Sequence, residues 1–178
     1  MQNVFRRPVV GVIGSGTEEH FAEANAVGGL LATLGVHLLT GGGRGVMAAV
    51  SRAFSETPGR EGLIIGVLPC RVDDPIRPKD GYPNPWVEIA IPTHLPLSGE
   101  RGTDPMSRNH INVLASDIVV VLPGGPGTAS EAELAVRYGK PIVAFLGSAD
   151  HVTVLPVSVP VMQSLDEVER YLRGALRL

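Results

Sequence analysis

The chain reads Pro123-Gly-Gly-Pro-Gly-Thr-Ala-Ser-Glu131 directly after the apolar run Asp117-Ile-Val-Val-Val-Leu122, and a helical pattern follows as far as Tyr138. A strand that passes through a glycine-rich turn into a helix forms an anion site. The glycines let backbone N–H groups approach a ligand closely, and the helix N-terminus adds partial positive charge. The stretch therefore predicts a ligand that carries phosphate or a comparable anion.

Two further turns have the same character, namely Gly11-Val-Ile-Gly-Ser-Gly-Thr17 and Leu39-Thr-Gly-Gly-Gly-Arg-Gly-Val-Met47. Four glycines among the five residues 41–45 predict a backbone cradle rather than a simple tight turn. The ligand-binding residues predicted from the three turns are Gly14, Ser15, Gly16, Thr40, Gly41, Gly42, Gly43, Arg44, Gly45, Met47, Pro123, Gly124, Gly125, Gly127, Thr128 and Glu131.

Strand and helix patterns alternate along the chain. The predicted strands are 8–13, 36–39, 63–68, 117–122 and 141–146, with 87–91 as an additional one, and the predicted helices are 17–34, 45–54, 105–115, 129–138 and 165–178. Continuous apolar strands between helices indicate a mostly parallel sheet covered on both faces, a three-layer α/β sandwich. We expect one domain over 1–178, a proline-rich surface loop at 71–85, and a ligand beyond the carboxyl ends of the strands.

Composition narrows the class of protein. The 178 residues include 15 basic and 18 acidic ones, a net charge of −3 that provides no basic field for a nucleic-acid partner. No apolar segment approaches the roughly 18 residues of a membrane span, so we expect no membrane partner and a cytoplasmic location. The single cysteine, Cys70, is expected to be buried at a strand end, and the five histidines show no spacing of metal ligands. No metal site is predicted.

Common nucleotide-binding motifs do not fit. Gly14-Ser-Gly16 lacks the third glycine of a dinucleotide fingerprint, because position 19 is Glu, and Thr40 stands where a ribose-binding acid is needed. NAD or FAD in the usual mode is thus disfavoured, and no P-loop Gly-Lys-Ser or Gly-Lys-Thr occurs. Two pairs, Ser15 with Glu18 and Thr128 with Glu131, have capping-box spacing, so helix initiation alone is an alternative for these residues.

Arg108 and Asn109 begin the helix that precedes the strand 117–122, which places them near the glycine turn that follows that strand. Arg108 is a candidate for a bidentate grip on a phosphate, with a surface salt bridge as the alternative. His110 is the one histidine kept as a candidate, because it stands beside Arg108.

The pairing of Gly41-Gly-Gly-Arg-Gly-Val-Met47 with Pro123-Gly-Gly-Pro-Gly-Thr-x-x-Glu131 resembles the Lonely Guy-like (LOG-like, SLOG) superfamily of Rossmann-like proteins. The resemblance extends from Val9 to about Leu146. Members of this group were formerly labelled lysine decarboxylase, but Lys79 and Lys140 are the only lysines and no pyridoxal lysine is evident. The resemblance implies a homodimer or higher homo-oligomer.

Two branches of the superfamily differ beside the arginine. Lonely Guy phosphoribohydrolases use an Arg-Lys pair and the motif glutamate, which would make Arg108 and Glu131 the catalytic residues, yet Asn109 stands in place of the lysine. Molybdenum cofactor carrier proteins tend to have Arg-Asn here. The resemblance thus implies a binding or carrier protein for a phosphorylated nucleotide-like or pterin ligand, with molybdenum cofactor as a possible cargo and no required cofactor. The alternatives are a nucleoside 5′-monophosphate phosphoribohydrolase and a nucleotide-sensing module without turnover.

Overall fold

The computed structural model describes residues 6–147 and 155–178. Its strands are β1 (Val9–Ile13), β2 (His37–Thr40), β3 (Ile64–Leu68), β4 (Ile89–Pro92), β5 (Ile118–Val121), β6 (Ile142–Phe145) and β7 (Val161–Met162). Its helices are α1 (Phe21–Thr33), α2 (Val46–Glu56), the short 3₁₀ helix η1 (Gly99–Arg101), α3 (Asn109–Ala115), α4 (Pro126–Arg137) and α5 (Leu165–Leu176). Because residues 1–5 and 148–154 lie outside the described ranges, one domain over 1–178 stays a prediction.

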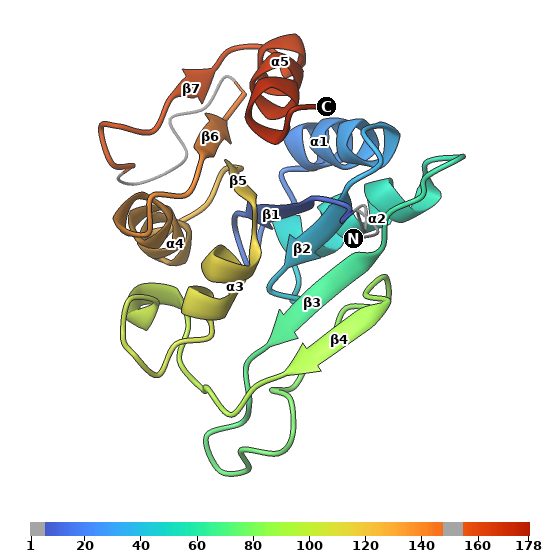
Figure 1. Ribbon diagram of the computed structural model, residues 1–178. Helices are drawn as coiled ribbons and strands as arrows, with labels where there is room; N and C mark the ends of the chain where they lie inside the picture. The colour runs from blue at the N-terminus through green and yellow to red at the C-terminus, as the bar shows by residue number, and fades with distance from the viewer. Residues whose placement is uncertain (1–5, 148–154) are drawn as a thin grey trace, which may run out of the picture.

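The seven strands form one sheet in the order β4-β3-β2-β1-β5-β6-β7, and every neighbouring pair is parallel (Figure 1). The predicted α/β class is confirmed. The central strands are runs of valine, isoleucine and leucine, and all four residues of β5 are buried. A strand that is covered on both faces needs apolar side chains at successive positions, which explains why these strands read as continuous apolar segments.

Helices cover both faces of the sheet, with α1, α2 and α5 on one side and α3 and α4 on the other (Figure 1). The first core contains Leu31, Leu38 and Phe54, whereas the second is built around the other faces of β5 and β6. Helices α1 and α2 cross closely at Gly28. A Cβ atom there would lie 2.6 Å from the Val50 carbonyl oxygen, so only glycine fits this crossing.

Four helices begin at other residues than predicted, although α2 differs by only one residue, at Val46 in place of Gly45. Helix α1 starts at Phe21, because residues 14–20 form a turn that ends with His20 in the left-handed region at φ 40°. Helix α3 starts at Asn109, since the Asp104 side chain and carbonyl hold residues 106 and 107 in a separate turn. Helix α4 starts earlier, at Pro126, whose fixed φ suits the first helical position. Neither η1 nor β7 was predicted.

The order of the strands reverses between β1 and β5. The chain leaves β1 toward α1 on one face and leaves β5 toward α4 on the opposite face, which opens a crevice at the carboxyl ends of both strands. All three glycine turns lie at carboxyl ends of strands, as predicted. The long connection from β3 to β4 extends beyond these ends at the bottom of Figure 1, and residues 71–85 form no helix or strand apart from a single bridge between Cys70 and Pro78.

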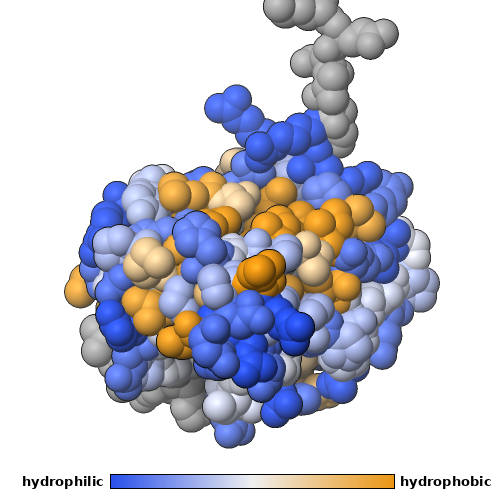
Figure 2. All heavy atoms as spheres, turned by 90° about the horizontal axis from the view of Figure 1, so that it is seen from below, coloured by the Kyte–Doolittle hydropathy of each residue, from blue (hydrophilic) through white to orange (hydrophobic). Residues whose placement is uncertain are grey.

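Within the part of the chain that the structure describes, no helix is long and apolar enough to cross a membrane. Cys70 is buried and free, as predicted. Figure 2 shows the face seen from below Figure 1, where apolar side chains gather in patches between hydrophilic ones. Exposed apolar side chains of the fold include Ile89 and Ile91 of β4 and Leu114 of α3.

Candidate functional site

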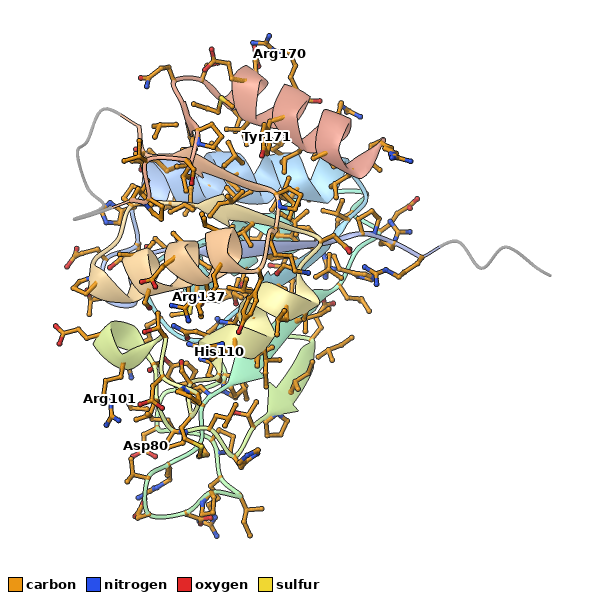
Figure 3. All side chains as sticks on the ribbon, turned by 60° about the vertical axis from the view of Figure 1, so that its left-hand side comes forward. Asp80, Arg101, His110, Arg137, Arg170 and Tyr171 are labelled. Atoms are coloured by element: carbon orange, nitrogen blue, oxygen red, sulfur yellow. The ribbon has the colours of Figure 1, made fainter. Side chains whose placement is uncertain are left out.

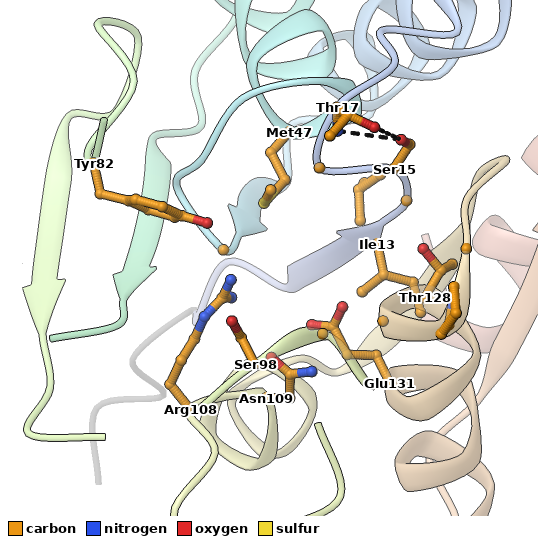
Figure 4. Close-up of a pocket in the computed structure, with 18 residues that line it drawn as sticks. Ile13, Ser15, Thr17, Met47, Tyr82, Ser98, Arg108, Asn109, Thr128 and Glu131 are labelled. Atoms are coloured by element: carbon orange, nitrogen blue, oxygen red, sulfur yellow. Dashed lines mark hydrogen bonds between the residues drawn. The ribbon is translucent and has the colours of Figure 1, made fainter. Parts of the chain in front are cut away.

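A pocket of about 280 Å³ lies in the crevice between β1 and β5 (Figure 4). Its floor is made by the turns that follow β1 and β5, and its walls by α3, α4 and the connections on either side of β4. The lining residues are Val12, Ile13, Gly14, Ser15, Gly16, Thr17, Gly41, Met47, Tyr82, Ser98, Gly99, Arg108, Asn109, Gly125, Pro126, Gly127, Thr128 and Glu131.

Ser15 joins the three glycine turns. Its backbone N–H donates to the Pro123 carbonyl at 2.9 Å, and its own carbonyl accepts from the Val46 N–H at 2.9 Å. Its Oγ accepts from the N–H groups of residues 17 and 18 at 3.2 and 2.9 Å. Ser15 and Glu18 therefore do not form a capping box of α1, which was the alternative role for this pair. The Ser15 hydroxyl closes a turn, and α1 begins only at Phe21.

A capping box of Thr128 and Glu131, the alternative to a ligand site, does not form either. Helix α4 begins at Pro126 after Gly125, so Thr128 already lies inside its first turn and no side chain caps the helix. Glu131 instead lines the pocket, where its Oε1 accepts a hydrogen bond of 2.9 Å from Nδ2 of Asn112 on α3. Its carboxyl is thus held by α3 at the pocket wall and does not cap its own helix.

Arg108 precedes α3 and points its guanidinium into the pocket (Figure 4). Although the residue is only 4 % exposed, its Nε and Nη1 have no hydrogen-bond partner among the described residues. The guanidinium packs on Gly41, where a Cβ atom would lie 2.0 Å from Nη1. Buried cations are normally paired, so this side chain indicates a place for an anion that comes from outside the chain.

Two further groups complete the polar part of the pocket. The buried Oδ1 of Asn109 lacks a partner within the described ranges and is available to a donor on a ligand. Burial raises the pKa of the Glu131 carboxyl, while the charge of Arg108 and the hydrogen bond from Asn112 act in the opposite direction. No ion pair within 4.0 Å joins Arg108 to any carboxylate in 6–147 or 155–178, so the cation and the carboxyl face the pocket separately.

Eleven of the predicted ligand-binding residues line the pocket, and the structure brings them together from five segments of the chain. They are Gly14, Ser15, Gly16, Gly41, Met47, Arg108, Asn109, Gly125, Gly127, Thr128 and Glu131.

The other seven predicted residues, Thr40, Gly42, Gly43, Arg44, Gly45, Pro123 and Gly124, do not line it. Most of them shape the turns. The Thr40 hydroxyl accepts from the N–H of Gly42 at 3.0 Å, and a Cβ at Gly45 or Gly124 would collide with the backbone at Ser15. Arg44 lines a neighbouring cavity. Glycine is required at positions 45 and 124 because the turns pack closely on one another.

Sequence reasoning missed Tyr82, Ser98 and Gly99, which come from the connections before and after β4. Buried Asn84 anchors the first connection, because its N–H donates to the Gly42 carbonyl at 2.7 Å and its Nδ2 to the Gly43 carbonyl at 2.9 Å. An asparagine within a proline-rich loop was the available signal for such an anchor, since its side chain readily bonds nearby backbone. The 71–103 segment is therefore part of the pocket wall.

His110 lies away from the pocket. Its Nδ1 is 2.6 Å from the Tyr138 hydroxyl and its Nε2 is 3.0 Å from the Asp104 carbonyl oxygen, and Figure 3 shows it on α3 beneath α4. His110, kept as a candidate because it follows Arg108 in sequence, is therefore not part of the pocket lining, since consecutive residues of a helix point in different directions. In the described residues, no group of three or more His, Cys, Asp or Glu side chains is arranged to hold a metal ion.

The strand order, the glycine turns beside the switch point and the unpaired buried arginine together define a Rossmann-like ligand-binding protein. The particular family follows from sequence. The model of the SLOG cluster4 family matches residues 7–169, and the chain belongs to this family.

Solved structures agree with this assignment. The molybdenum cofactor binding protein of the phototrophic bacterium Rippkaea orientalis is 29 % identical, with a TM-score of 0.73 over 97 % of this chain and 99 % of that one. The molybdenum cofactor carrier protein of Chlamydomonas reinhardtii is 29 % identical, with a TM-score of 0.71 over 97 % of this chain and 100 % of that one.

A relative is also found by sequence alone. An uncharacterized protein of Archaeoglobus fulgidus is 34 % identical over 137 residues, which are 76 % of this chain and 78 % of the relative.

Proposed function

We propose that this protein binds and carries a phosphorylated pterin of the molybdenum cofactor type. The observation that carries the proposal is Arg108, a buried guanidinium with two unpaired nitrogens that faces a pocket floored by glycine turns. A phosphate there would receive charge-assisted hydrogen bonds from Arg108 and the partial positive charge of the α4 N-terminus. The similarity to a molybdenum cofactor binding protein and to a carrier protein supports the same ligand class.

The remaining polar groups suit a heterocycle. A pterin presents N–H donors on its pyrimidine ring, and Asn109 Oδ1 and the Glu131 carboxyl are acceptors on the pocket wall. Among the residues that the structure describes, no histidine or cysteine side chain lines the pocket. The metal of such a cargo would therefore keep the sulfur ligands of the cargo itself, and the protein would hold the organic part.

The test is titration of the purified protein with molybdopterin, followed by binding calorimetry and thermal unfolding. Arg108→Gln should weaken binding by about 10- to 150-fold, which corresponds to one charge-assisted hydrogen bond of about 1.5–3 kcal/mol. Arg137→Gln on the exposed face of α4 removes the same charge away from the pocket and should leave binding unchanged. Equal affinities of wild type and Arg108→Gln would refute the proposed phosphate site at Arg108.

Hydrolysis of nucleoside 5′-monophosphates is the second candidate. The specific observation in its favour is Glu131, a carboxyl with a raised pKa in the same pocket as Arg108. Such a group can position water or assist departure of the base. Asn109 argues against it, since a neutral amide stands where the hydrolases of the superfamily carry lysine.

Overnight incubation with AMP, CMP, GMP and a cytokinin ribotide, with chromatography for free base, decides between carriage and turnover. Release of base that is lost in Glu131→Gln and retained in Glu133→Gln would establish the hydrolase. Glu133 is a matched control because it lies exposed on the same helix and pairs with Arg137. No release, together with molybdopterin binding, supports the carrier.

We also propose that the protein is a homodimer or higher homo-oligomer in the cytoplasm. The exposed apolar side chains Ile89, Ile91 and Leu114 are consistent with a surface covered by another copy. Light scattering coupled to size exclusion measures the molar mass, and a value equal to one chain of 18.7 kDa would overturn the proposal.

A further inference from the structure

A second cavity, of about 470 Å³, adjoins the pocket beside the N-terminus of α2. Thr17 and Tyr82 line both cavities, so the two are neighbouring halves of one cleft. Figure 4 shows these two side chains at the upper rim of the first pocket. A ligand longer than a single phosphorylated heterocycle can therefore continue past Tyr82 into the second cavity.

The second cavity has its own cation. Arg44 lines it and is exposed, and its side chain makes no hydrogen bond or ion pair with any residue in 6–147 or 155–178. The guanidinium lies beside Gly81, where a Cβ atom would be 3.3 Å from Nε. It thus provides an exposed positive charge in the second half, beside Gly81 and next to the shared Tyr82 in sequence, in addition to Arg108 in the first half.

The second cavity also has aromatic walls. Tyr82 and Trp86 line it, and Asn84 between them is fixed to the carbonyls of Gly42 and Gly43. The Arg52 guanidinium lies 5.8 Å from the Trp86 ring centroid and supports the ring from one side. Aromatic rings beside an arginine are the combination with which proteins hold a nucleobase and its phosphate.

We infer that the cleft takes a ligand of the dinucleotide type, in which a phosphorylated heterocycle in the first pocket is joined through a pyrophosphate to a nucleotide in the second cavity. The inference rests on the proposed function for its first half. Arg44 contacts the bridging phosphates, and the second base lies against Tyr82 and Trp86.

Two guanine compounds test the inference, because guanine carries the same 2-amino-4-oxopyrimidine ring as a pterin. They are GMP and diguanosine diphosphate, in which two guanosines are joined 5′ to 5′ through a pyrophosphate. Trp86 is the only tryptophan of the chain, so its fluorescence reports on the second cavity directly. Affinity is measured by calorimetry, and molybdopterin is titrated in parallel.

Diguanosine diphosphate should bind at least about 10-fold more tightly than GMP and should change the Trp86 fluorescence, whereas GMP should bind without changing it. Arg44→Gln should abolish the advantage of the dinucleotide and leave GMP affinity as it was. Arg77→Gln, an exposed arginine of the 71–85 loop outside both linings, should change neither. A dinucleotide affinity no higher than that of GMP, including no binding of either, overturns the inference. Molybdopterin binding separates this failure from a failure of the proposed function.

Discussion

Replacing Gly41 by alanine should disable the pocket without unfolding the protein. The added Cβ would lie 2.0, 2.3 and 2.5 Å from Nη1, Nη2 and Cζ of Arg108. Normal contact between heavy atoms requires about 3.5 Å, so the guanidinium must move by about 1 Å or more. Because Gly41 does not have a positive φ, alanine meets no backbone strain there, and the arginine side chain has to yield.

Two magnitudes follow from this displacement. Overpacking beside a buried side chain costs about 1–3 kcal/mol of the free energy of unfolding. Loss of the charge-assisted contact from Arg108 costs about 1.5–3 kcal/mol of molybdopterin binding, or about 10- to 150-fold in affinity. If Gly41 acts only through Arg108, then Gly41→Ala combined with Arg108→Gln should bind like Arg108→Gln alone, within about 0.5 kcal/mol.

Calorimetric titration with molybdopterin measures the affinity, and thermal unfolding confirms that each variant is folded. Gly174→Ala is the matched control, because a Cβ at this position in α5 meets no atom within 4 Å. It should leave binding unchanged and raise stability by about 0.5–1 kcal/mol. Wild-type affinity in folded Gly41→Ala would refute the reasoning, as would additive losses in the double variant.

Three other changes test the packing, the charge and a cap. Gly28→Ala should lower the free energy of unfolding by about 1–3 kcal/mol, since the new Cβ would lie 2.6 Å from the Val50 carbonyl oxygen. Denaturant unfolding measures this loss. A midpoint equal to that of wild type would contradict the close packing of α1 on α2. Burial raises the pKa of Glu131 above its ordinary value of 4.5, so the stability linked to its proton is present below that pH and is lost as pH rises through the folded pKa. Wild type should therefore lose stability relative to Glu131→Gln as pH rises above 4.5, and parallel pH profiles of the two would show that the carboxyl is not perturbed. Ser164→Ala removes the capping box of α5, in which the Ser164 Oγ accepts from the Glu167 N–H, and should cost about 0.5–2 kcal/mol in thermal unfolding, with no change in ligand binding.

The layered fold could be predicted because its signals are local and repeated. Each buried parallel strand needs a run of apolar residues, and β1, β3 and β5 display such runs openly. Helix starts were less accurate, because they depend on contacts between distant segments. The turn at residues 14–20 is held by backbone bonds from Ser15 to residues 46 and 123, which no local pattern reveals. The two-residue β7 is too short to show the hydrophobic pattern by which a strand is recognised in a sequence.

The parts of the candidate site that lie in glycine-rich turns could be predicted from the sequence. The side chains that reach the pocket from the connections around β4 could not. Ser15, Gly125 and Thr128 line the pocket as their motifs indicated, and Arg108 lies beside them because its helix precedes β5. Tyr82 and Ser98 reach the same pocket through tertiary folding of the connections around β4. The prolines and glycines around them predict loops, but they do not predict where in the fold those loops lie.

The anchoring of the pocket by Ser15 divides the cleft into a fixed floor and an exchangeable wall. The floor is bonded to α2 and β5 through backbone atoms, so a substitution there disturbs several turns together. Tyr82, Trp86 and Ser98 stand on the connections around β4, the strand at one edge of the sheet. We therefore expect that ligand preference can be changed at Tyr82, Trp86 and Ser98, provided that Asn84 and Leu97 are kept. Asn84 and Leu97 bond the backbone of Gly42 and Arg108, which belong to the glycine turn and the arginine of the proposed phosphate site.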